Sequence, residues 1–161
     1  MWTVTDSPIG ELRLVEDDGA IIAIDFYPFD YADGRLSGER VDDHPLLVEC
    51  GRQLEEYFAG ERNTFELPLA PVGTPFQQRV WEQLQTIGYG ETATYGQIAG
   101  RLGLTGHGAR AVGLANGRNP IPVVIPCHRV IGAKGALTGY AGGMERKQLL
   151  LDLESDAEAL F

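Results

Sequence analysis

Cys127 and His128 are adjacent in the sequence and follow directly after Pro126. A thiolate is a nucleophile, and an imidazole close to it can take the thiol proton, directly or through water. Adjacent residues of a strand point to opposite faces, but a proline forces the residue before it into an extended conformation and favours a bend. We therefore predict an exposed bend at which both side chains line one pocket, with Cys127 as the nucleophile.

The second cysteine, Cys50, has different surroundings. It lies on the apolar stripe of a predicted helix over 45–58, where a small buried hydrophobe is the expected role. His44 and His107 do not stand at metal-ligand spacing with either cysteine, and no Cys-x-x-Cys pair occurs, so we predict no metal site. Both cysteines are expected to be free thiols in a reducing compartment.

The sequence divides into two parts around residues 67–74, where two prolines and a glycine interrupt the pattern. Residues 1–72 predict an α/β N-terminal domain with a small antiparallel sheet, and residues 73–161 predict a mainly α C-terminal domain containing a helix-turn-helix. Strands are expected at 2–5, 12–15 and 21–27. Helices of the second domain are expected at 74–86, 95–102, 107–116 and 144–153, with a frayed tail over 155–161; the second and third of these form the helix-turn-helix.

The charge of the chain is unevenly distributed. The net charge of -10 argues against a nucleic-acid partner. However, residues 76–150 carry eight basic residues against three acidic ones, whereas residues 1–75 carry five against sixteen. A basic face on an acidic protein is compatible with DNA contact. No apolar run approaches the roughly 18 residues of a membrane span, and no signal peptide is present, so we expect a cytoplasmic protein without membrane association.

Four segments in this order carry a family resemblance: residues 76–81 (FQQRVW), 90–95 (GETATY), 108–113 (GARAVG) and 126–130 (PCHRV). Together they resemble the O6-alkylguanine-DNA alkyltransferases, also called methylated-DNA-protein-cysteine methyltransferases. The close match runs from residue 73 to residue 154. The resemblance implies a monomeric, single-use repair enzyme without a cofactor. It would transfer an alkyl group, typically methyl, irreversibly from O6 of guanine, and less readily from O4 of thymine, to Cys127.

The same resemblance implies roles for further residues. Glu154 would orient His128, Asn119 would brace the active-site turn, and Tyr95 would assist nucleotide rotation and polarise the guanine. The substrate is double-stranded DNA containing O6-alkylguanine, whose damaged base must leave the stack at a cost of a few kcal/mol. Arg110 would enter the base stack in its place. The small residues around this arginine would allow close approach to the minor groove; they are Ala109, Ala111 and Gly113.

The alkylated base would bind in a pocket that the resemblance also outlines. The carbonyls of Cys127 and Val130 would accept hydrogen bonds from the guanine amine, and Gly142 would leave room beside the alkyl group. Ala141 stands where several relatives have serine, and its backbone N–H is expected to make the contact. The complete predicted pocket comprises Tyr95, Pro122, Val130, Tyr140, Ala141 and Gly142.

Three alternative functions fit parts of the sequence less well. An alkyltransferase-like protein binds damaged DNA without transfer, but lacks the cysteine that is present here at position 127. A transcription factor would need polar base-reading side chains where the helix over 107–116 carries alanine and glycine. A Cys-His hydrolase would turn over on an ester or amide, which single-use methyl transfer would exclude.

Overall fold

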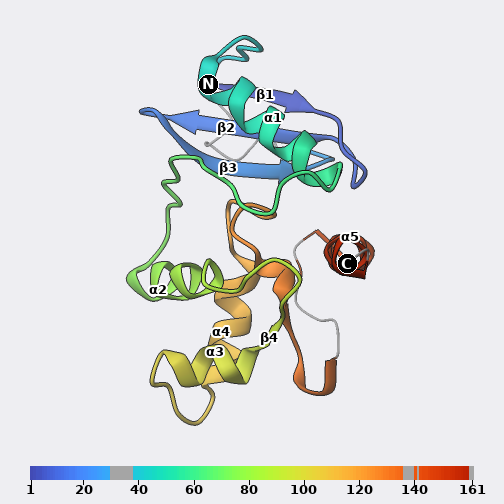
Figure 1. The fold of residues 1–161 in the computed structure, drawn as a ribbon. Coiled ribbons are helices and arrows are strands. Elements are labelled where there is room, and N and C mark those ends of the chain that lie inside the picture. The colour runs from blue at the N-terminus through green and yellow to red at the C-terminus, as the bar shows by residue number, and fades with distance from the viewer. Residues whose placement is uncertain (30–37, 136–139, 141, 160–161) are drawn as a thin grey trace. The chain divides into compact units, whose positions relative to one another are not determined.

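The computed structural model describes residues 1–29, 38–135, 140 and 142–159 (Figure 1). The chain divides into two compact units, Met1–Val72 and Gly73–Phe161. Each unit has its own packed interior.

The first unit is a three-stranded antiparallel sheet covered by one helix. The strands are β1 (Trp2–Thr5), β2 (Leu12–Asp17) and β3 (Ala20–Phe26), in the order β1-β2-β3. The central strand β2 is buried from Leu12 to Glu16, because the helix α1 (Pro45–Phe58) packs on the sheet. The predicted α/β unit with a small antiparallel sheet is therefore confirmed.

Helix α1 begins where its sequence provides a start signal. Pro45 occupies the first helical turn, and the His44 ring accepts a hydrogen bond from the backbone N–H of Leu46 at 3.2 Å. Cys50 is fully buried, and burial raises the pKa of its thiol to about 12. This cysteine therefore packs as an uncharged, apolar side chain.

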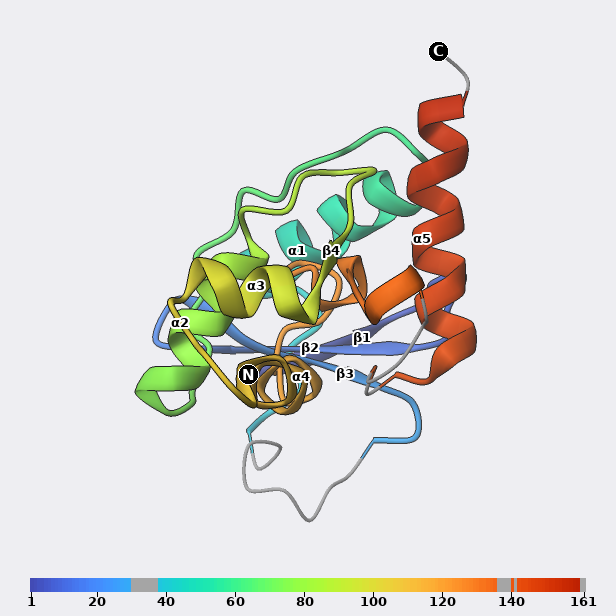
Figure 2. The same ribbon diagram turned by 90° about the horizontal axis from the view of Figure 1, so that it is seen from below.

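The second unit is mainly helical. Its elements are α2 (Pro75–Leu84), β4 (Ala93–Thr94), α3 (Tyr95–Arg101), α4 (Gly108–Gly117), a 3₁₀ turn (Cys127–Arg129), β5 (Val130–Ile131), a second 3₁₀ turn (Ala133–Gly135) and α5 (Met144–Ala159). β4 and β5 pair in parallel. Helices α2, α3 and α4 pack together, and the turn that carries Cys127 lies between this group and α5 (Figures 1 and 2).

One predicted boundary in this unit is wrong. Helix α5 continues to Ala159, whereas a frayed tail was expected over 155–161. The residues beyond Leu153 include alanine and glutamate, which are strong helix formers, and no glycine or proline ends the helix there. Within the described ranges, no helix combines the length and hydropathy needed to cross a membrane.

Capping boxes fix the starts of α2 and α3. Thr74 and Thr94 each accept a hydrogen bond from the N–H three residues later, and the side chains of Gln77 and Gln97 accept from the backbone N–H groups of these threonines. At the end of α2, the buried Trp81 indole donates to the carbonyl of Ala115 at 2.9 Å, which ties α2 to α4.

Helices α3 and α4 pack closely around a short connection. Gly103 and Gly106 adopt positive φ angles of 71° and 65°, which glycine tolerates without strain. A Cβ placed on Gly108 would lie 2.6 Å from Leu104 Cβ, so only glycine permits this approach. The two helices and their turn match the elements predicted for the helix-turn-helix, and α4 leaves Ala109, Arg110 and Leu114 exposed.

Candidate active site

A braced turn leads into Cys127. The Asn119 side chain accepts a hydrogen bond from Ile121 N at 3.0 Å and donates to the Ile125 carbonyl at 2.8 Å. Ile125 N also donates to the Ile121 carbonyl. Inside this turn Val123 has a φ of 71°, a conformation that is costly for a β-branched residue. Asn119 therefore holds together both ends of a strained segment directly before the cysteine.

Cys127 itself is buried, with 3% of its surface exposed. The predicted exposed bend is wrong, because the residues before Pro126 are apolar and pack into the interior of the unit. Burial raises the pKa of the Cys127 thiol to about 11, although a hydrogen bond with Asn119 and the charge of Lys147 oppose this shift. The resting thiol is consequently protonated at neutral pH.

His128 and Arg129 share one buried carboxylate. His128 Nε2 lies 2.8 Å from Glu154 Oε2. Arg129 donates from Nε to Glu154 Oε1 at 2.8 Å and from Nη2 to Glu154 Oε2 at 3.0 Å. A third guanidinium nitrogen, Nη1, donates to the Ile87 carbonyl at 2.7 Å. Helix α5 therefore supplies the carboxylate that links both residues following Cys127.

The protonation states in this network follow from its contacts. Burial disfavours the charged form of Glu154, but the hydrogen bonds from His128 and Arg129 outweigh burial and hold its pKa at about 2. Burial lowers the pKa of His128 despite the opposing effect of Glu154, so the ring is neutral at pH 7. An ionised carboxylate only accepts, so the ring proton lies on Nε2. Nδ1 then carries a lone pair, and it has no hydrogen-bond partner among the described residues.

Lys147 was not identified from the sequence. Its side chain is fully buried; Nζ donates to the Val130 carbonyl at 2.6 Å and lies 5.9 Å from the centre of the Tyr95 ring. Burial lowers its pKa, and the proximity of Cys127 opposes this. The sequence feature that could have revealed its burial is the helical spacing of Lys147, Leu150 and Glu154, which lie on the buried face of α5.

Asn116 is a second residue that was not predicted. It lies on α4, is 1% exposed, and donates from Nδ2 to the Cys127 carbonyl at 3.2 Å. Its Oδ1 atom accepts no hydrogen bond from the described residues. A polar side chain at a position that helical periodicity assigns to the interior was the available signal. Asn116 joins the helix of Arg110 to the backbone of Cys127.

The residues predicted to form the pocket for the alkylated base differ in how deeply they are buried. Tyr95 is half-buried at the start of α3, and a Cβ added at Gly113 would lie 3.8 Å from its ring, so α4 passes directly beside this tyrosine. Tyr140 is buried; burial and the neighbouring Cys127 raise its pKa well above the usual value. Pro122, Val130 and Gly142 are buried as well. Ala141 lies outside the described residues.

The residues predicted to contact DNA lie elsewhere on the unit. Ala109 and Arg110 are exposed on α4, and Ala111 and Gly113 are half-buried on the same helix. The structure therefore groups Cys127, His128 and Glu154 in the interior and presents Arg110 to solvent.

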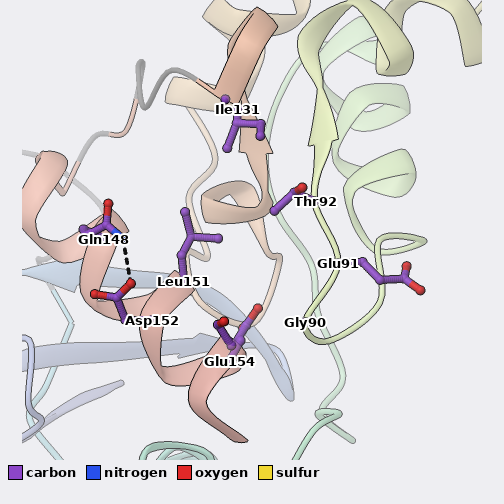
Figure 3. A pocket seen from close by; sticks show the side chains of 10 residues that line it. Gly90, Glu91, Thr92, Ile131, Gln148, Leu151, Asp152 and Glu154 are labelled. Atoms are coloured by element: carbon purple, nitrogen blue, oxygen red, sulfur yellow. Dashed lines mark hydrogen bonds between the residues drawn. The ribbon is translucent and has the colours of Figure 1, made fainter. Parts of the chain in front are cut away.

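A cavity of about 380 Å³ lies beside Glu154 (Figure 3). It is lined by the segment 90–92 that precedes β4, by Ile131 and Gly135, and by residues of α5 between Gln148 and Ser155. Among the residues that the structure describes, neither Cys127 nor any member of the predicted pocket lines it. The described part of the chain contains no group of three or more histidine, cysteine, aspartate or glutamate residues that is arranged to hold a metal ion.

Comparison with known proteins assigns both units to one family. The DNA binding domain of 6-O-methylguanine DNA methyltransferase matches residues 75–156, and the ribonuclease-like domain of the same protein matches residues 1–71. The chain belongs to the 6-O-methylguanine DNA methyltransferase family. The resemblance found in the sequence motifs is thereby confirmed.

Individual relatives match this chain over nearly its full length. A Methylated-DNA–protein-cysteine methyltransferase of Methanosarcina acetivorans is 46% identical over 161 residues, covering 95% of this chain and 97% of its own length. The constitutive protein of that name from Bacillus subtilis is 46% identical over 156 residues, with coverages of 95% and 94%. The crystal structure of Mycobacterium tuberculosis OGT in complex with DNA superposes with a TM-score of 0.89 at 46% identity, covering 97% of this chain and 93% of that chain. This structural match also confirms the predicted fold class of an N-terminal unit with a small antiparallel sheet and a mainly helical C-terminal unit.

Proposed function

We propose that this methyltransferase-family protein repairs O6-alkylguanine in duplex DNA by moving the alkyl group to Sγ of Cys127, with O4-alkylthymine as a lesser substrate. The observation that carries the proposal is the buried arrangement of Cys127 next to a His128 ring that is held by Glu154 at 2.8 Å. Family membership and relatives named Methylated-DNA–protein-cysteine methyltransferase support it.

Activation of the thiol is the first step. With a pKa of about 11, Cys127 needs a base to form a thiolate at neutral pH. Neutral His128 is suited to this task because Nε2–H donates to Glu154 and leaves the lone pair of Nδ1 available to take the thiol proton, directly or through water. The ionised Glu154 would stabilise the resulting imidazolium. Glu154 and Arg129 thus position a base that is needed only at the moment of reaction.

Alkyl transfer is a substitution at an sp³ carbon. The Cys127 thiolate attacks the alkyl carbon, the S–C bond forms, and the C–O6 bond breaks with its electron pair passing to guanine. Guanine takes up a proton to complete the exchange. The product thioether has no leaving group that water displaces readily, so each protein molecule acts once. No cofactor is required for any of these bonds to form or break.

Base recognition would use backbone groups that already have partners. The Cys127 carbonyl accepts from the Asn116 side chain and from the Val130 N–H, and the Val130 carbonyl accepts from Lys147. A carbonyl oxygen has two lone pairs, so the amine of a rotated guanine would bind beside Lys147 at the Val130 carbonyl and would replace one of the two donors at the Cys127 carbonyl. Because these carbonyls are already held in place, less conformational entropy is lost when the base binds.

DNA would approach from the side of α4. Tyr95 would assist rotation of the damaged nucleotide and polarise the base, and Arg110 would fill the vacated place in the stack. We further propose that the protein acts in the cytoplasm as a monomer, since one chain supplies every group named here.

The proposal is tested by mixing the protein with a short duplex that contains one O6-methylguanine and measuring intact mass. We expect the mass to increase by one methyl group and to stop at one equivalent, with no increase for Cys127→Ala. Binding to the lesion without a mass change would instead indicate a damage-recognition protein. Release of product with repeated turnover would contradict the single-use reaction.

A further inference from the structure

A tight turn over residues 88–91 precedes β4 and is closed by two hydrogen bonds. Glu91 N donates to the Gly88 carbonyl at 3.0 Å, and the Glu91 carboxylate accepts from Gly88 N at 3.0 Å. Gly90 has a φ of 77°, which glycine adopts without strain. The turn is therefore fixed by its own residues, and it presents one aromatic side chain, Tyr89.

Tyr89 packs beside the guanidinium of Arg129. The centre of its ring lies 5.8 Å from Arg129 Cζ, within the range of cation–π attraction. The carbonyl of Ile87, directly before the turn, accepts from Arg129 Nη1 at 2.7 Å. The other two nitrogens, Nε and Nη2, donate to Glu154. The segment 87–91 therefore contacts Arg129 through an aromatic ring and through the nitrogen that does not bind Glu154.

The tyrosine also lies close to the carboxylate of this ion pair. Burial and the negative charge of Glu154 raise the pKa of the Tyr89 phenol, and the charge of Arg129 opposes them. Gly90, the next residue of the turn, lines the cavity of Figure 3 together with Glu154. Tyr89 is half-buried, whereas Arg129 is 7% exposed and Glu154 is 2% exposed. Tyr89 is thus a partly exposed residue at the margin of a buried ion pair.

We propose that Tyr89 is a positioning residue for alkyl transfer: its ring holds the Arg129 guanidinium in the plane that orients Glu154. This inference rests on the proposed function, in which Glu154 orients His128 as the base. A guanidinium and a carboxylate form two parallel hydrogen bonds only when they are nearly coplanar. Glu154 Oε2 is shared by Arg129 Nη2 and His128 Nε2, so a tilt of the guanidinium moves the acceptor of the imidazole proton.

The ring of Tyr89 also excludes water from these charges. Hydrogen bonds to a carboxylate are electrostatically stronger where water is excluded. A smaller side chain at position 89 would admit water to the pair of Arg129 and Glu154 and weaken the bonds that orient His128. Both effects need the aromatic ring and not the hydroxyl group, so phenylalanine should replace Tyr89 and leucine should not.

The first test is single-turnover methyl transfer from a duplex containing O6-methylguanine, followed by mass, for Tyr89→Phe and Tyr89→Leu. At saturating DNA we expect Tyr89→Phe to react at the wild-type rate and Tyr89→Leu to react about tenfold more slowly. The affinity for DNA should not change, because the substitution acts on the orientation of His128. Tyr27→Leu is the matched control, since it makes the same change at an exposed tyrosine of the first unit, and it should react as the wild type does.

A second comparison separates positioning from packing. In a Glu154→Gln background, Tyr89→Leu should slow transfer by less than about twofold further, because its effect passes through the carboxylate. A ring that only filled space would slow transfer equally in both backgrounds. Thermal melting identifies a temperature at which every variant is folded, and the rates are compared there.

A third measurement does not depend on methyl transfer. The chain has three histidines, so NMR can follow the His128 imidazole against pH beside those of His44 and His107. The two other imidazoles serve as internal references, because neither belongs to the network around Glu154.

The contacts of His128 give the direction expected in this titration. Burial lowers its pKa, Glu154 raises it, and Arg129 and Lys147 lower it. Loss of the ring would admit water and displace Arg129, and both changes favour the charged imidazole. The midpoint of His128 should therefore move to higher pH in Tyr89→Leu and stay at the wild-type value in Tyr89→Phe.

Three results would each overturn the inference. They are wild-type transfer with an unchanged His128 midpoint in Tyr89→Leu, equal losses in the two backgrounds, and a slow Tyr89→Phe. A wild-type protein that does not accept methyl would instead refute the proposed function, and the His128 titration would still show whether Tyr89 holds the network.

Discussion

Replacing Glu154 by glutamine should destabilise the second unit by about 3 kcal/mol at neutral pH. The carboxylate accepts three hydrogen bonds, one from His128 and two from Arg129, and it is 2% exposed. Its pKa of about 2 lies well below the 4.5 that is usual for a glutamate, and a pKa difference of one corresponds to about 1.4 kcal/mol. A glutamine has one acceptor oxygen, so its amide group must face a donor of His128 or Arg129.

The pH dependence of this effect has a defined sign. A carboxylate whose pKa is depressed in the folded state stabilises the protein fully above its unfolded pKa, and the stabilisation is lost as pH falls toward the folded pKa. The advantage of the wild type over Glu154→Gln should therefore be complete above about pH 4.5 and shrink toward pH 2. Removing one member of a buried ion pair elsewhere costs about 3–5 kcal/mol, which agrees with the magnitude from the pKa.

The measurement is urea denaturation from pH 7 downward in a shared Trp2→Phe background, so that Trp81 reports on the second unit. Glu145→Gln is the matched control, because Glu145 is exposed on the same helix, and we expect a change below about 0.5 kcal/mol. At neutral pH, Glu154→Gln should also slow methyl transfer by about 10²- to 10⁴-fold if Glu154 positions the general base. A loss of stability under 1 kcal/mol, or one that does not change with pH, would refute the reasoning.

Other substitutions test separate parts of the site. Asn119→Ala removes both hydrogen bonds that brace the turn before Cys127. It should lower the free energy of unfolding, measured by urea denaturation, by about 2 kcal/mol. An unchanged free energy of unfolding would show that the strained turn is stable without Asn119. Lys147→Met keeps the packing but removes a charge that lowers the pKa of Cys127, so the transfer rate should reach its half-maximal value at a higher pH in single-turnover kinetics. A profile superimposable on that of the wild type would contradict this electrostatic role. Thr94→Ala removes the capping box of α3 and should cost about 1 kcal/mol, lowering the melting temperature by about 2–4 °C, whereas an equal melting temperature would mean that tertiary packing alone fixes the helix start.

Local signals in the sequence were sufficient to predict most of the helices and strands. Thr74-Pro75 and Thr94 predict helix starts because a threonine cap and a proline act through contacts within three residues. The alternating apolar residues of 2–5 and 12–15 likewise identified the antiparallel strands. The end of α5 was missed because nothing local stops that helix, and stop signals are what a sequence pattern detects.

The candidate site was harder to predict from local sequence patterns than the fold. Glu154 lies 26 residues from His128, and the motif resemblance joined them before the structure placed them 2.8 Å apart. Asn116 and Lys147 were not joined to the site in that way. Helical periodicity could indicate that they are buried, but their partners are backbone carbonyls of Cys127 and Val130, which no side-chain pattern identifies. The burial of Cys127 was also missed, since a bend at a proline reveals a change of direction and says nothing about what packs over it.

The central claim is that Cys127, and not the other buried thiol, accepts the alkyl group. The most direct measurement is peptide-resolved mass spectrometry after reaction with excess duplex containing O6-methylguanine, which follows the peptides of Cys50 and Cys127 separately. We predict complete methylation of the Cys127 peptide, none on the Cys50 peptide, and one repaired guanine per protein molecule. Methyl on Cys50, or repaired guanine without methyl on either cysteine, would contradict the account.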